Sequence, residues 1–233
     1  MNLYDQFFWL IYPYIMLTLF VAGHIYRYNT DLFGWSARSS QILEMKRLRL
    51  GSILFHWGII FVFFGHVAGV LIPKGFYEAI GITEEMYHFG AVLFGGAAGV
   101  AAAVGILLLF CRRAFVPRIR INSQKRDFLV LFLLAAVILT GFTNTVGYTA
   151  TGAAFDYRET IGPWFRGILT FTPDVQLVTG APLSFQIHIF SALLLFGIWP
   201  FTRLVHMWSL PLEYLNRHYI VYRRMRAKKL TDS

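Results

Sequence analysis

Five long apolar runs alternate with shorter polar stretches along the 233-residue chain, at residues 4–26, 52–71, 87–110, 128–146 and 183–207. An α-helix rises about 1.5 Å per residue, so about 20 residues cross the roughly 30 Å hydrocarbon core of a bilayer. Each run has about that length or more. The pattern therefore predicts an all-α integral membrane protein, built as a bundle of five transmembrane helices.

The second run is distinguished by two histidines. Residues 51–71 read GSILFHWGIIFVFFGHVAGVL and carry His56 and His66 but no charged residue. Lipid offers an imidazole no hydrogen bond, so an ionisable side chain at membrane depth indicates a functional site. Neutral imidazole is also a common axial ligand of haem iron. The run thus points to a helix that carries cofactor ligands.

Composition agrees with a membrane location, since 57% of the residues are hydrophobic and the mean hydropathy is +0.56. The single cysteine, Cys111, permits no intrachain disulfide, and no CxxCH motif or cysteine set for an iron–sulfur cluster is present. An electron carrier of this composition would hold its cofactor mainly through histidine. The N-terminal MNLYDQFF has no basic segment, so we expect no removable signal peptide.

The basic residues divide unequally between the two sides of the predicted bundle. All but three of the 21 Lys and Arg fall within 27–49, 112–126 and 203–229, and the exceptions are Lys74, Arg158 and Arg166. The positive-inside rule then puts the N-terminus outside and the C-terminus in the cytoplasm, and an odd number of spans requires opposite sides. The net charge of +9 is explained as a topology signal, with lipid headgroups and a cytoplasmic partner as further uses, and needs no nucleic acid.

This topology sorts four histidines by depth. His66 and His188 lie toward the exterior, whereas His56 and His206 lie toward the cytoplasm. A six-coordinate haem needs two imidazoles that face each other from neighbouring helices. The two pairs at matched depth predict two haems stacked across the membrane, in a single domain over residues 1–233 with a basic tail from about 209.

The spacings of these histidines do not match on straight helices. The ten residues from His56 to His66 correspond to a rise of about 15 Å, and the eighteen from His188 to His206 to about 27 Å. Eighteen residues make whole turns, but ten leave His66 about 80° around the helix from His56. Helix tilt, a kink at Pro200, or a position of His206 in the last turn would absorb the difference.

Simpler interpretations apply to single residues. One intramembrane histidine is more often a hydrogen-bonding residue than a ligand. The remaining three are expected to pack, to lie at a surface, or to belong to the basic tail: His24, His88 and His218. Gly58, Gly65 and Gly69 allow a flat ring or another helix to approach, whereas the GGAAG run at 95–99 is typical of plain helix packing. In the connection 148–182, TIGPWFRGILTF predicts a short interfacial helix with Trp164 and Phe165 among the headgroups.

Four stretches carry a resemblance to a known family. They are IYRYNTDLFGWSARSSQ after the first run, the two-histidine helix itself, IPKGFYEA behind it, and PFTRLVHMWSLPLEYLNR near the end. In these, and essentially from end to end, the sequence resembles the gamma subunits of respiratory nitrate reductases, which are dihaem cytochromes b of the cell membrane.

The resemblance implies a division of roles. His66 and His188 would hold an outer haem b, and His56 and His206 an inner one. Menaquinol or ubiquinol would be oxidised near the outer haem, and electrons would pass to an iron–sulfur beta subunit and a molybdenum-containing alpha subunit at the cytoplasmic face, where nitrate is reduced. Arg203, close to His206, would either pair with a propionate of the inner haem or anchor headgroups.

The expected quinol site departs from the family pattern. Some members place a lysine near the start of the third helix, where this chain reads TEEMYHFG. The candidate quinol-site residues are therefore Gly65, His66, Tyr87 and His88. The candidate acceptors of the quinol protons are His66, Glu84, Glu85 and His88.

Three other functions are compatible with the sequence. A gamma-like cytochrome b could anchor another quinol-linked reductase, a haem-free transporter or proton channel could use the histidines as a relay, and a passive anchor would need none of them. A b-type absorption band separates a haem-containing electron conduit from the haem-free relay. Replacement of His56 and His66 by leucine separates the electron conduit from the passive anchor, which would keep its function.

Overall fold

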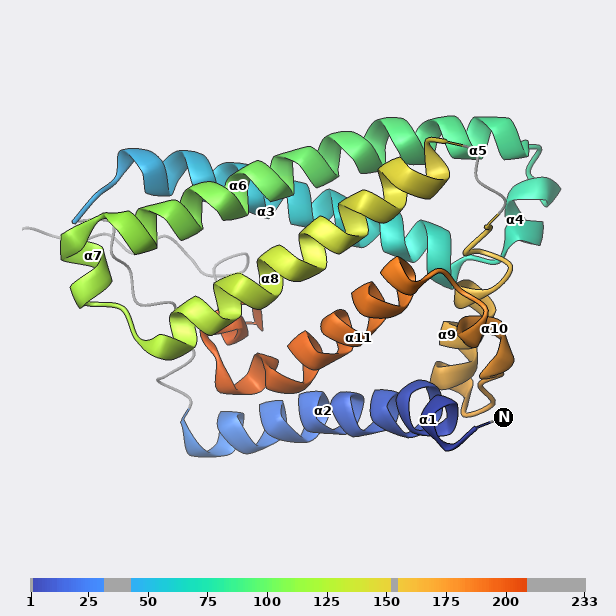
Figure 1. The fold of residues 1–233 in the computed structure, drawn as a ribbon, viewed down its shortest axis with the longest axis horizontal. Helices are drawn as coiled ribbons and strands as arrows, with labels where there is room; N and C mark the ends of the chain where they lie inside the picture. The colour runs from blue at the N-terminus through green and yellow to red at the C-terminus, as the bar shows by residue number, and fades with distance from the viewer. Residues whose placement is uncertain (1, 32–42, 152–154, 209–233) are drawn as a thin grey trace, which may run out of the picture.

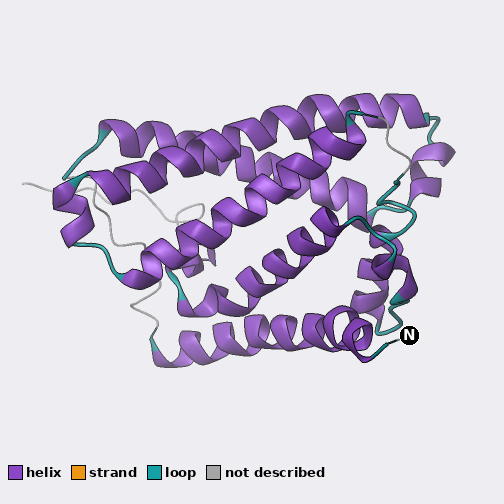
Figure 2. Cartoon of the chain, in the orientation of Figure 1, coloured by secondary structure: helices purple, strands orange, loops and turns teal. Residues whose placement is uncertain are grey.

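The five apolar runs are helical in the computed structural model, which describes residues 2–31, 43–151 and 155–208. Within these residues the chain forms helices and connecting loops and no strand (Figure 2). Five helical stretches are long and apolar enough to cross a membrane: Leu3–Thr30, Lys46–Leu71, Glu84–Phe115, Lys125–Tyr148 and Leu183–Phe201. The predicted five-helix membrane architecture is confirmed.

Four of the five spans combine α-helix with one π-helical turn, and the fifth ends in a 3₁₀ turn. The spans comprise α1 (Leu3–Gln6), η1 (Phe7–Ile11) and α2 (Tyr12–Thr30); α3 (Lys46–His66) and η3 (Val67–Leu71); α5 (Glu84–Gly90), η4 (Ala91–Gly95) and α6 (Gly96–Phe115); α8 (Lys125–Asn144) and η5 (Thr145–Thr149); and α11 (Leu183–Ile198) with η6 (Trp199–Phe201). The shorter helices are α4 (Lys74–Ala79), α7 (Pro117–Ile121), α9 (Ile161–Thr170), α10 (Gln176–Thr179) and the 3₁₀ segment η7 (Arg203–Trp208).

The spans lie side by side, with α7 at one end of the bundle and α4, α9, α10 and the N-terminus at the other (Figure 1). We call these the α7 end and the α9 end. In packing order across the bundle, α3 contacts α6, α6 contacts α8, α8 contacts α11, and α11 contacts α2. Thus α3, which carries His56 and His66, and α11, which carries His188, are separated in packing order by α6 and α8.

Glycines bring α3 and α6 into close contact. A Cβ at Gly58 would lie 2.5 Å from the backbone nitrogen of Ala102, and one at Gly105 would collide with the backbone of Phe55. In the GGAAG run, a Cβ at Gly99 would come within 2.8 Å of the Phe142 ring on α8. Small residues at such positions let membrane helices approach backbone to backbone. The packing interpretation of the GGAAG run is therefore confirmed at Gly99.

The fifth span is shorter than the sequence predicts. The apolar run reaches residue 207, but α11 ends at Ile198 and the 3₁₀ turn η6 follows with Pro200 inside it. Thr202 is then extended, with φ −119° and ψ −179°, before η7 begins at Arg203. Proline lacks a backbone N–H and clashes with the preceding turn, so the helix ends here. His206 consequently lies on a separate turn beyond the break.

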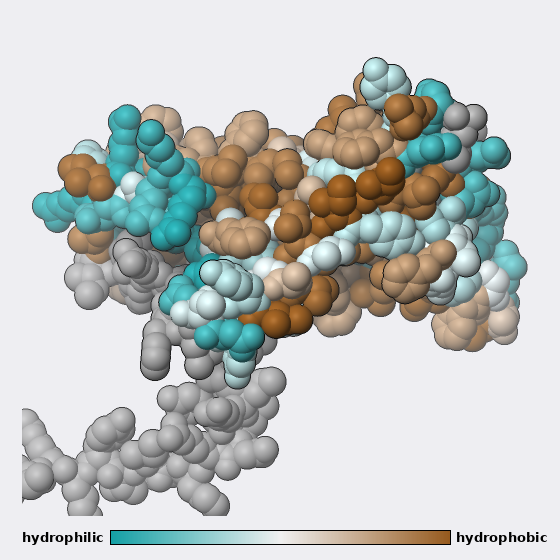
Figure 3. Space-filling view, turned by 90° about the horizontal axis from the view of Figure 1, so that it is seen from below, coloured by the Kyte–Doolittle hydropathy of each residue, from teal (hydrophilic) through white to brown (hydrophobic). Residues whose placement is uncertain are grey.

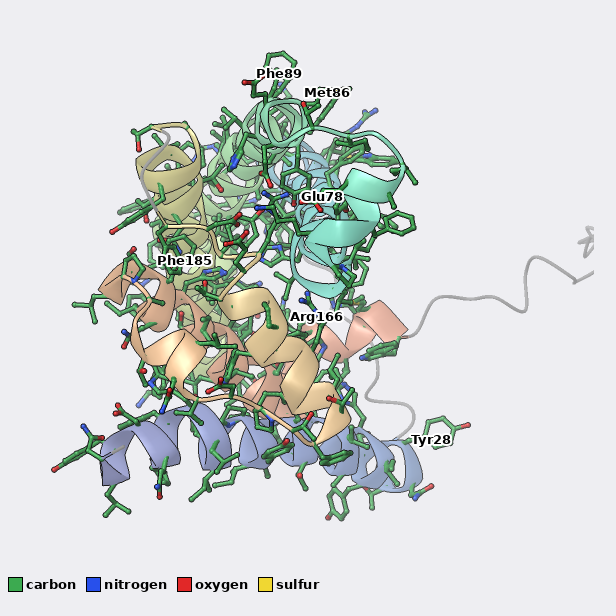
Figure 4. The ribbon with its side chains drawn as sticks, turned by 90° about the vertical axis from the view of Figure 1, so that its right-hand side faces the viewer. Tyr28, Glu78, Met86, Phe89, Arg166 and Phe185 are labelled. Carbon is green, nitrogen blue, oxygen red and sulfur yellow. The ribbon has the colours of Figure 1, made fainter. Side chains whose placement is uncertain are left out.

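The connection between the fourth and fifth spans folds over the α9 end, where α9 and α10 lie between α2 and α4 (Figure 4). The predicted short helix is confirmed as α9. Trp164, however, is only 1% exposed, and its indole Nε1 donates to the carbonyl of Trp9 at 2.9 Å. The expectation that Trp164 faces headgroups is wrong, because its ring and N–H are both used inside the bundle.

The outer surface of the bundle is apolar. Large side chains of α3 face outward, with Trp57, Phe61 and Phe64 each about 60% exposed. The space-filling view shows brown, hydrophobic side chains over the middle of the molecule and teal, hydrophilic ones gathered toward its two ends (Figure 3). This distribution is that of a protein surrounded by lipid, with its polar ends in the two aqueous phases.

Candidate functional site

The four histidines predicted to pair by depth do meet in two pairs. The ring centres of His66 on α3 and His188 on α11 are 5.9 Å apart, and their planes are inclined by 28°. The ring centres of His56 on α3 and His206 on η7 are 6.2 Å apart, at 72°. Residues more than 120 positions apart in the sequence are thus brought together twice.

Hydrogen bonds to backbone carbonyls define the protonation of these rings. His56 Nδ1 lies 2.7 Å from the carbonyl oxygen of Ser52, and His66 Nδ1 lies 2.8 Å from that of Val62, each one turn earlier on α3. A carbonyl oxygen only accepts, so Nδ1 of each ring carries the proton. The lone pair of the neutral ring is then on Nε2, which is the arrangement of a metal-ligating histidine.

The partners of these rings are held in the same way by different elements. His206 Nδ1 donates to the carbonyl of Arg203 at 2.6 Å, within its own 3₁₀ turn. His188 Nδ1 instead donates across to α8, to the carbonyl of Val137 at 3.0 Å, with Thr140 Oγ1 at 3.2 Å. In all four imidazoles, therefore, Nδ1 faces a backbone carbonyl.

The distance between the rings fits one metal ion between the members of each pair. A metal–imidazole nitrogen bond is about 2 Å long, so two rings on opposite sides of one ion have centres roughly 6 Å apart. The described residues contain no group of three or more His, Cys, Asp or Glu able to hold a metal ion. Two imidazoles without further protein ligands are the donor set for a metal whose other positions belong to a flat macrocycle, as in haem.

Space for a flat ring is also present. The side chains of His56 and His66 are exposed, and a Cβ at Gly65 would meet nothing within 4 Å. The second span is also the least buried of the five, since only 11% of its most apolar stretch is buried inside the bundle. Its histidine face is thus accessible.

Gly141 is a residue that sequence reasoning missed. A Cβ at this position of α8 would lie 2.8 Å from Cε1 of His188. Glycine therefore lets α8 approach the ring closely enough for Val137 to accept its hydrogen bond. A glycine in the middle of an apolar helix was the only available signal, and it does not say what approaches.

Known proteins resemble this sequence over most of its length. The family described as nitrate reductase gamma subunit matches residues 5–225. The chain belongs to this family. It is 51% identical over 219 residues to the nitrate reductase gamma chain of Bacillus subtilis, covering 94% of this chain and 98% of that one. It is 37% identical over 227 residues to the respiratory nitrate reductase 1 gamma chain of Escherichia coli, covering 96% and 99%.

A more distant relative adds a second context. The Hdr-like menaquinol oxidoreductase cytochrome b-like subunit of Archaeoglobus fulgidus is 28% identical over 168 residues, which cover 70% of this chain and 48% of the relative. Membership of the gamma subunit family makes this chain a multi-pass cell-membrane protein and the haem-containing cytochrome b component of a nitrate reductase complex.

The candidate quinol-site residues gather only in part. Tyr87 reaches the turn that follows His66, because a Cβ at Gly69 of η3 would lie 3.0 Å from the Tyr87 hydroxyl and 2.9 Å from that of Tyr157. The two hydroxyls are 3.2 Å apart. His88 instead contacts Glu84, with its Nε2 3.5 Å from a carboxylate oxygen.

Charged groups surround these tyrosines at the α9 end. The Arg158 guanidinium lies over the Tyr87 ring, 4.0 Å from its centre, and pairs with Glu84 and with Asp156. Lys74 Nζ is 2.7 Å from Glu84 and 2.5 Å from Glu159. A lysine near the start of the third span is thus present in space, although it comes from α4.

The electrostatics of this cluster follow from burial and pairing. Hydrogen bonds from Lys74 to Glu159 and Glu84 raise the pKa of the lysine above its usual range, so it is charged at neutral pH. Burial raises the pKa of the Tyr157 hydroxyl. The phenol is therefore neutral and acts as a hydrogen-bond donor or acceptor rather than as an anion.

Arg203 and His24 make protein contacts at the α7 end. Arg203 Nε donates to a carboxylate oxygen of Asp127 at 2.9 Å. His24 Nδ1 donates to the carbonyl of Phe20 at 2.6 Å, and its ring contacts Phe20 and Trp208 edge-on. These contacts of His24 are those of the packing residue that the sequence predicts.

Proposed function

We propose that this chain oxidises quinol at the α9 end and conducts the electrons, one at a time, to a partner at the α7 end. The observation that carries the proposal is the double histidine pairing, in which each pair has ring centres about 6 Å apart and Nδ1 committed to a carbonyl. One such pair would serve a single cofactor, whereas two at different depths make a conduit across the bilayer.

The ligand assignment follows from this pairing. His66 and His188 would hold one haem b, and His56 and His206 the other. Haem supplies reversible one-electron chemistry when bound, tuned by its axial ligands and by the hydrogen bonds to them. The chain's own part is to present Nε2 of each ring, to keep the tautomer through Nδ1, and to exclude water through the surrounding apolar helices.

The orientation in the membrane is part of the proposal. Among the described residues, the α9 end carries Lys74, Arg158 and Arg166, and the other Lys and Arg belong to the α7-end segments 27–31, 43–49, 112–126 and 203–208. By the positive-inside rule the α7 end is cytoplasmic, and the N-terminus at the α9 end is outside. Quinol protons would then be released outside while electrons move inward, which conserves energy as membrane potential.

The quinol would bind beside the His66–His188 pair. Gly65, His66, Tyr87 and His88 remain the candidate residues, and Tyr87 is supported by its position over the turn that follows His66. Glu84, Glu85, His88 and His66 are the candidate proton acceptors. Lys74 adds a fixed positive charge here, which favours the ionised form of the Glu84 carboxylate. The cytochrome b-like relative from a menaquinol oxidoreductase supports quinol as the donor class.

The partners would be the iron–sulfur beta subunit and the molybdenum-containing alpha subunit, docked at the cytoplasmic α7 end. The basic tail from residue 209 onward, predicted to take part in docking, lies outside the described residues. Arg203 is proposed to reach a propionate of the haem at the His56–His206 pair. Its hydrogen bond to Asp127 uses Nε, and the two terminal nitrogens of the guanidinium would make the contact to the propionate.

The test is spectroscopic and uses the intact complex. A reduced-minus-oxidised spectrum should show b-type α-bands, and haem quantitation should give two haems per chain. Addition of a quinol should reduce both, and nitrate should reoxidise them. Absence of b-type haem would overturn the proposal in favour of a histidine relay, and haem that quinol does not reduce would overturn the quinol-oxidising role.

A further inference from the structure

His206 is placed by a segment that is not part of any long helix. The fifth span stops at Ile198, Thr202 is extended, and the six-residue 3₁₀ segment η7 then carries His206. A short 3₁₀ turn has little stability of its own. Some other part of the protein must therefore fix the position of this ring, and the described contacts identify two groups that do so.

The first group is Arg27, near the end of α2. Its NH1 donates to the carbonyl of Pro200 at 2.6 Å and to that of Thr202 at 2.8 Å. Carbonyls at a helix break have lost their intrahelical partners and are costly to bury unpaired. One charged side chain of the first span thus satisfies two carbonyls on either side of residue 201, and fixes the course of the chain where it leaves the helix.

The second group is Asp127, in the first turn of α8, whose side chain is 8% exposed. One carboxylate oxygen accepts from Arg113 NH1 at 2.9 Å and from the backbone N–H of Gln124 at 3.1 Å. The other oxygen accepts from Arg203 Nε at 2.9 Å. The carbonyl of that same Arg203 accepts from His206 Nδ1 at 2.6 Å. Asp127 is therefore connected to the imidazole of His206 through Arg203, by two hydrogen bonds.

We propose that Asp127 and Arg27 are positioning residues for His206, and that together they set the orientation of its ring toward His56. This inference rests on the proposed haem ligation. Asp127 fixes the side chain of Arg203, and the backbone of Arg203 fixes the ring. Arg27 fixes the carbonyls of Pro200 and Thr202, just before Arg203 in the chain. The His66–His188 pair has no place in this chain of contacts, because its rings are held by Val62 and Val137.

The measurement should report ring orientation rather than charge. Removing a nearby charge shifts a haem potential whatever the geometry, so potentials alone do not discriminate. The electron paramagnetic resonance g-values of a low-spin iron with two imidazole ligands depend on the angle between the imidazole planes. The signal of each pair is assigned by its disappearance in His206→Leu or His188→Leu, in the purified complex.

Asp127→Asn should shift or abolish the g-value signal of the His56–His206 site and leave that of the His66–His188 site unchanged. Where the signal is lost, haem affinity should fall by about 10- to 100-fold, the usual effect of removing an outer partner of a metal ligand. Asp127→Glu, which keeps the charge and both acceptors, should restore at least part of the signal. Arg27→Gln should act on the same signal by the independent route.

Two matched controls separate positioning from the other roles of Asp127. Gln124→Ala removes the other half of the helix cap in which Asp127 takes part, and Arg113→Gln removes its other ion pair. Both should leave the two signals unchanged. Equal shifts in either control, or unchanged signals in both Asp127→Asn and Arg27→Gln, would overturn the inference. If the unsubstituted complex lacked two b-type signals, the proposed function itself would fail.

Discussion

The two histidine pairs are built from the same side chain but are supported in different ways. In the His66–His188 pair both residues lie on regular helices, and His188 is held by a neighbouring helix that approaches at Gly141. In the His56–His206 pair one histidine lies on a helix and the other on a short turn beyond a helix break. The ring positions in the first pair depend on close packing between helices, and those in the second pair depend on buried charged side chains.

This difference in support predicts different sensitivities. Close-packed interiors respond to small changes in volume, because neighbouring atoms cannot yield. Ion pairs between buried groups respond to the loss of charge, because the remaining partner is left unpaired. The interplanar angles also differ, at 28° and 72°, so the two sites should give separate low-spin signals.

The largest expected effect is loss of one haem. Leucine at position 66 or 188 should remove the haem of one pair, and leucine at 56 or 206 that of the other, because leucine has no ligand atom. Haem quantitation on the four variants should fall from two per chain to one. Retention of both haems by any of the four would break the pairing on which the comparison rests.

A second effect should be confined to the His66–His188 pair. Gly141→Ala places a methyl group 2.8 Å from the His188 ring, and overpacking of this kind costs about 1–3 kcal/mol, or roughly 5- to 150-fold in haem affinity. Titration of the apoprotein with haem measures the change. Gly147→Ala is the matched control, since a Cβ there meets nothing within 4 Å; equal effects at the two positions would contradict the packing account.

A third, smaller effect should appear only in the rate at which quinol reduces the haems. Tyr87→Phe removes one hydroxyl beside the turn that follows His66, and loss of one hydrogen bond typically costs about 1 kcal/mol, or roughly five-fold in rate. Quinol-driven haem reduction should slow by that amount, while reduction by dithionite should not change. Tyr77→Phe is the comparison, because that hydroxyl donates to the carbonyl of Ala68; identical slowing by both would remove the specific role of Tyr87.

The smallest effect concerns stability at the α9 end. Lys74→Met removes ion pairs with Glu84 and Glu159 and should cost about 1 kcal/mol or less, as expected for partly exposed pairs. Folding raises the lysine pKa, so its contribution is complete below the unfolded-state pKa of about 10.4 and is lost only at more alkaline pH. Thermal unfolding in detergent should therefore show the same difference at pH 7 and pH 9, and a difference that vanishes by pH 9 would contradict the assignment.

Much of the fold could be predicted because a bilayer imposes a simple constraint. Apolar runs must be helical, and their length must match the hydrocarbon core, so the spans at residues 52–71 and 128–146 lie within those of the structure. The end of the fifth span could not be read from hydropathy, since the run of apolar residues continues past Pro200. There the local effect of proline, not the apolar pattern, decides where the helix ends.

The site divides in a similar way. Pairing by depth needs only the direction of each span, so the meetings of His66 with His188 and of His56 with His206 were predictable. The supporting residues were not, because Val137, Gly141 and Asp127 act through contacts between distant parts of the chain. The same holds for Lys74, which meets Glu159 of the connection between the fourth and fifth spans.

The positions of the four histidines along the chain also govern when each pair is completed during synthesis. His56 and His66 leave the ribosome early and can be oriented at once by carbonyls of their own helix. Their partners follow more than 120 residues later, when α8 already offers the carbonyl of Val137. A nascent chain that stops before residue 188 has no complete pair, and one that stops before 206 has a single pair. With the proposed ligation, insertion of the cofactors would therefore be a late step, open only to a chain that is nearly finished.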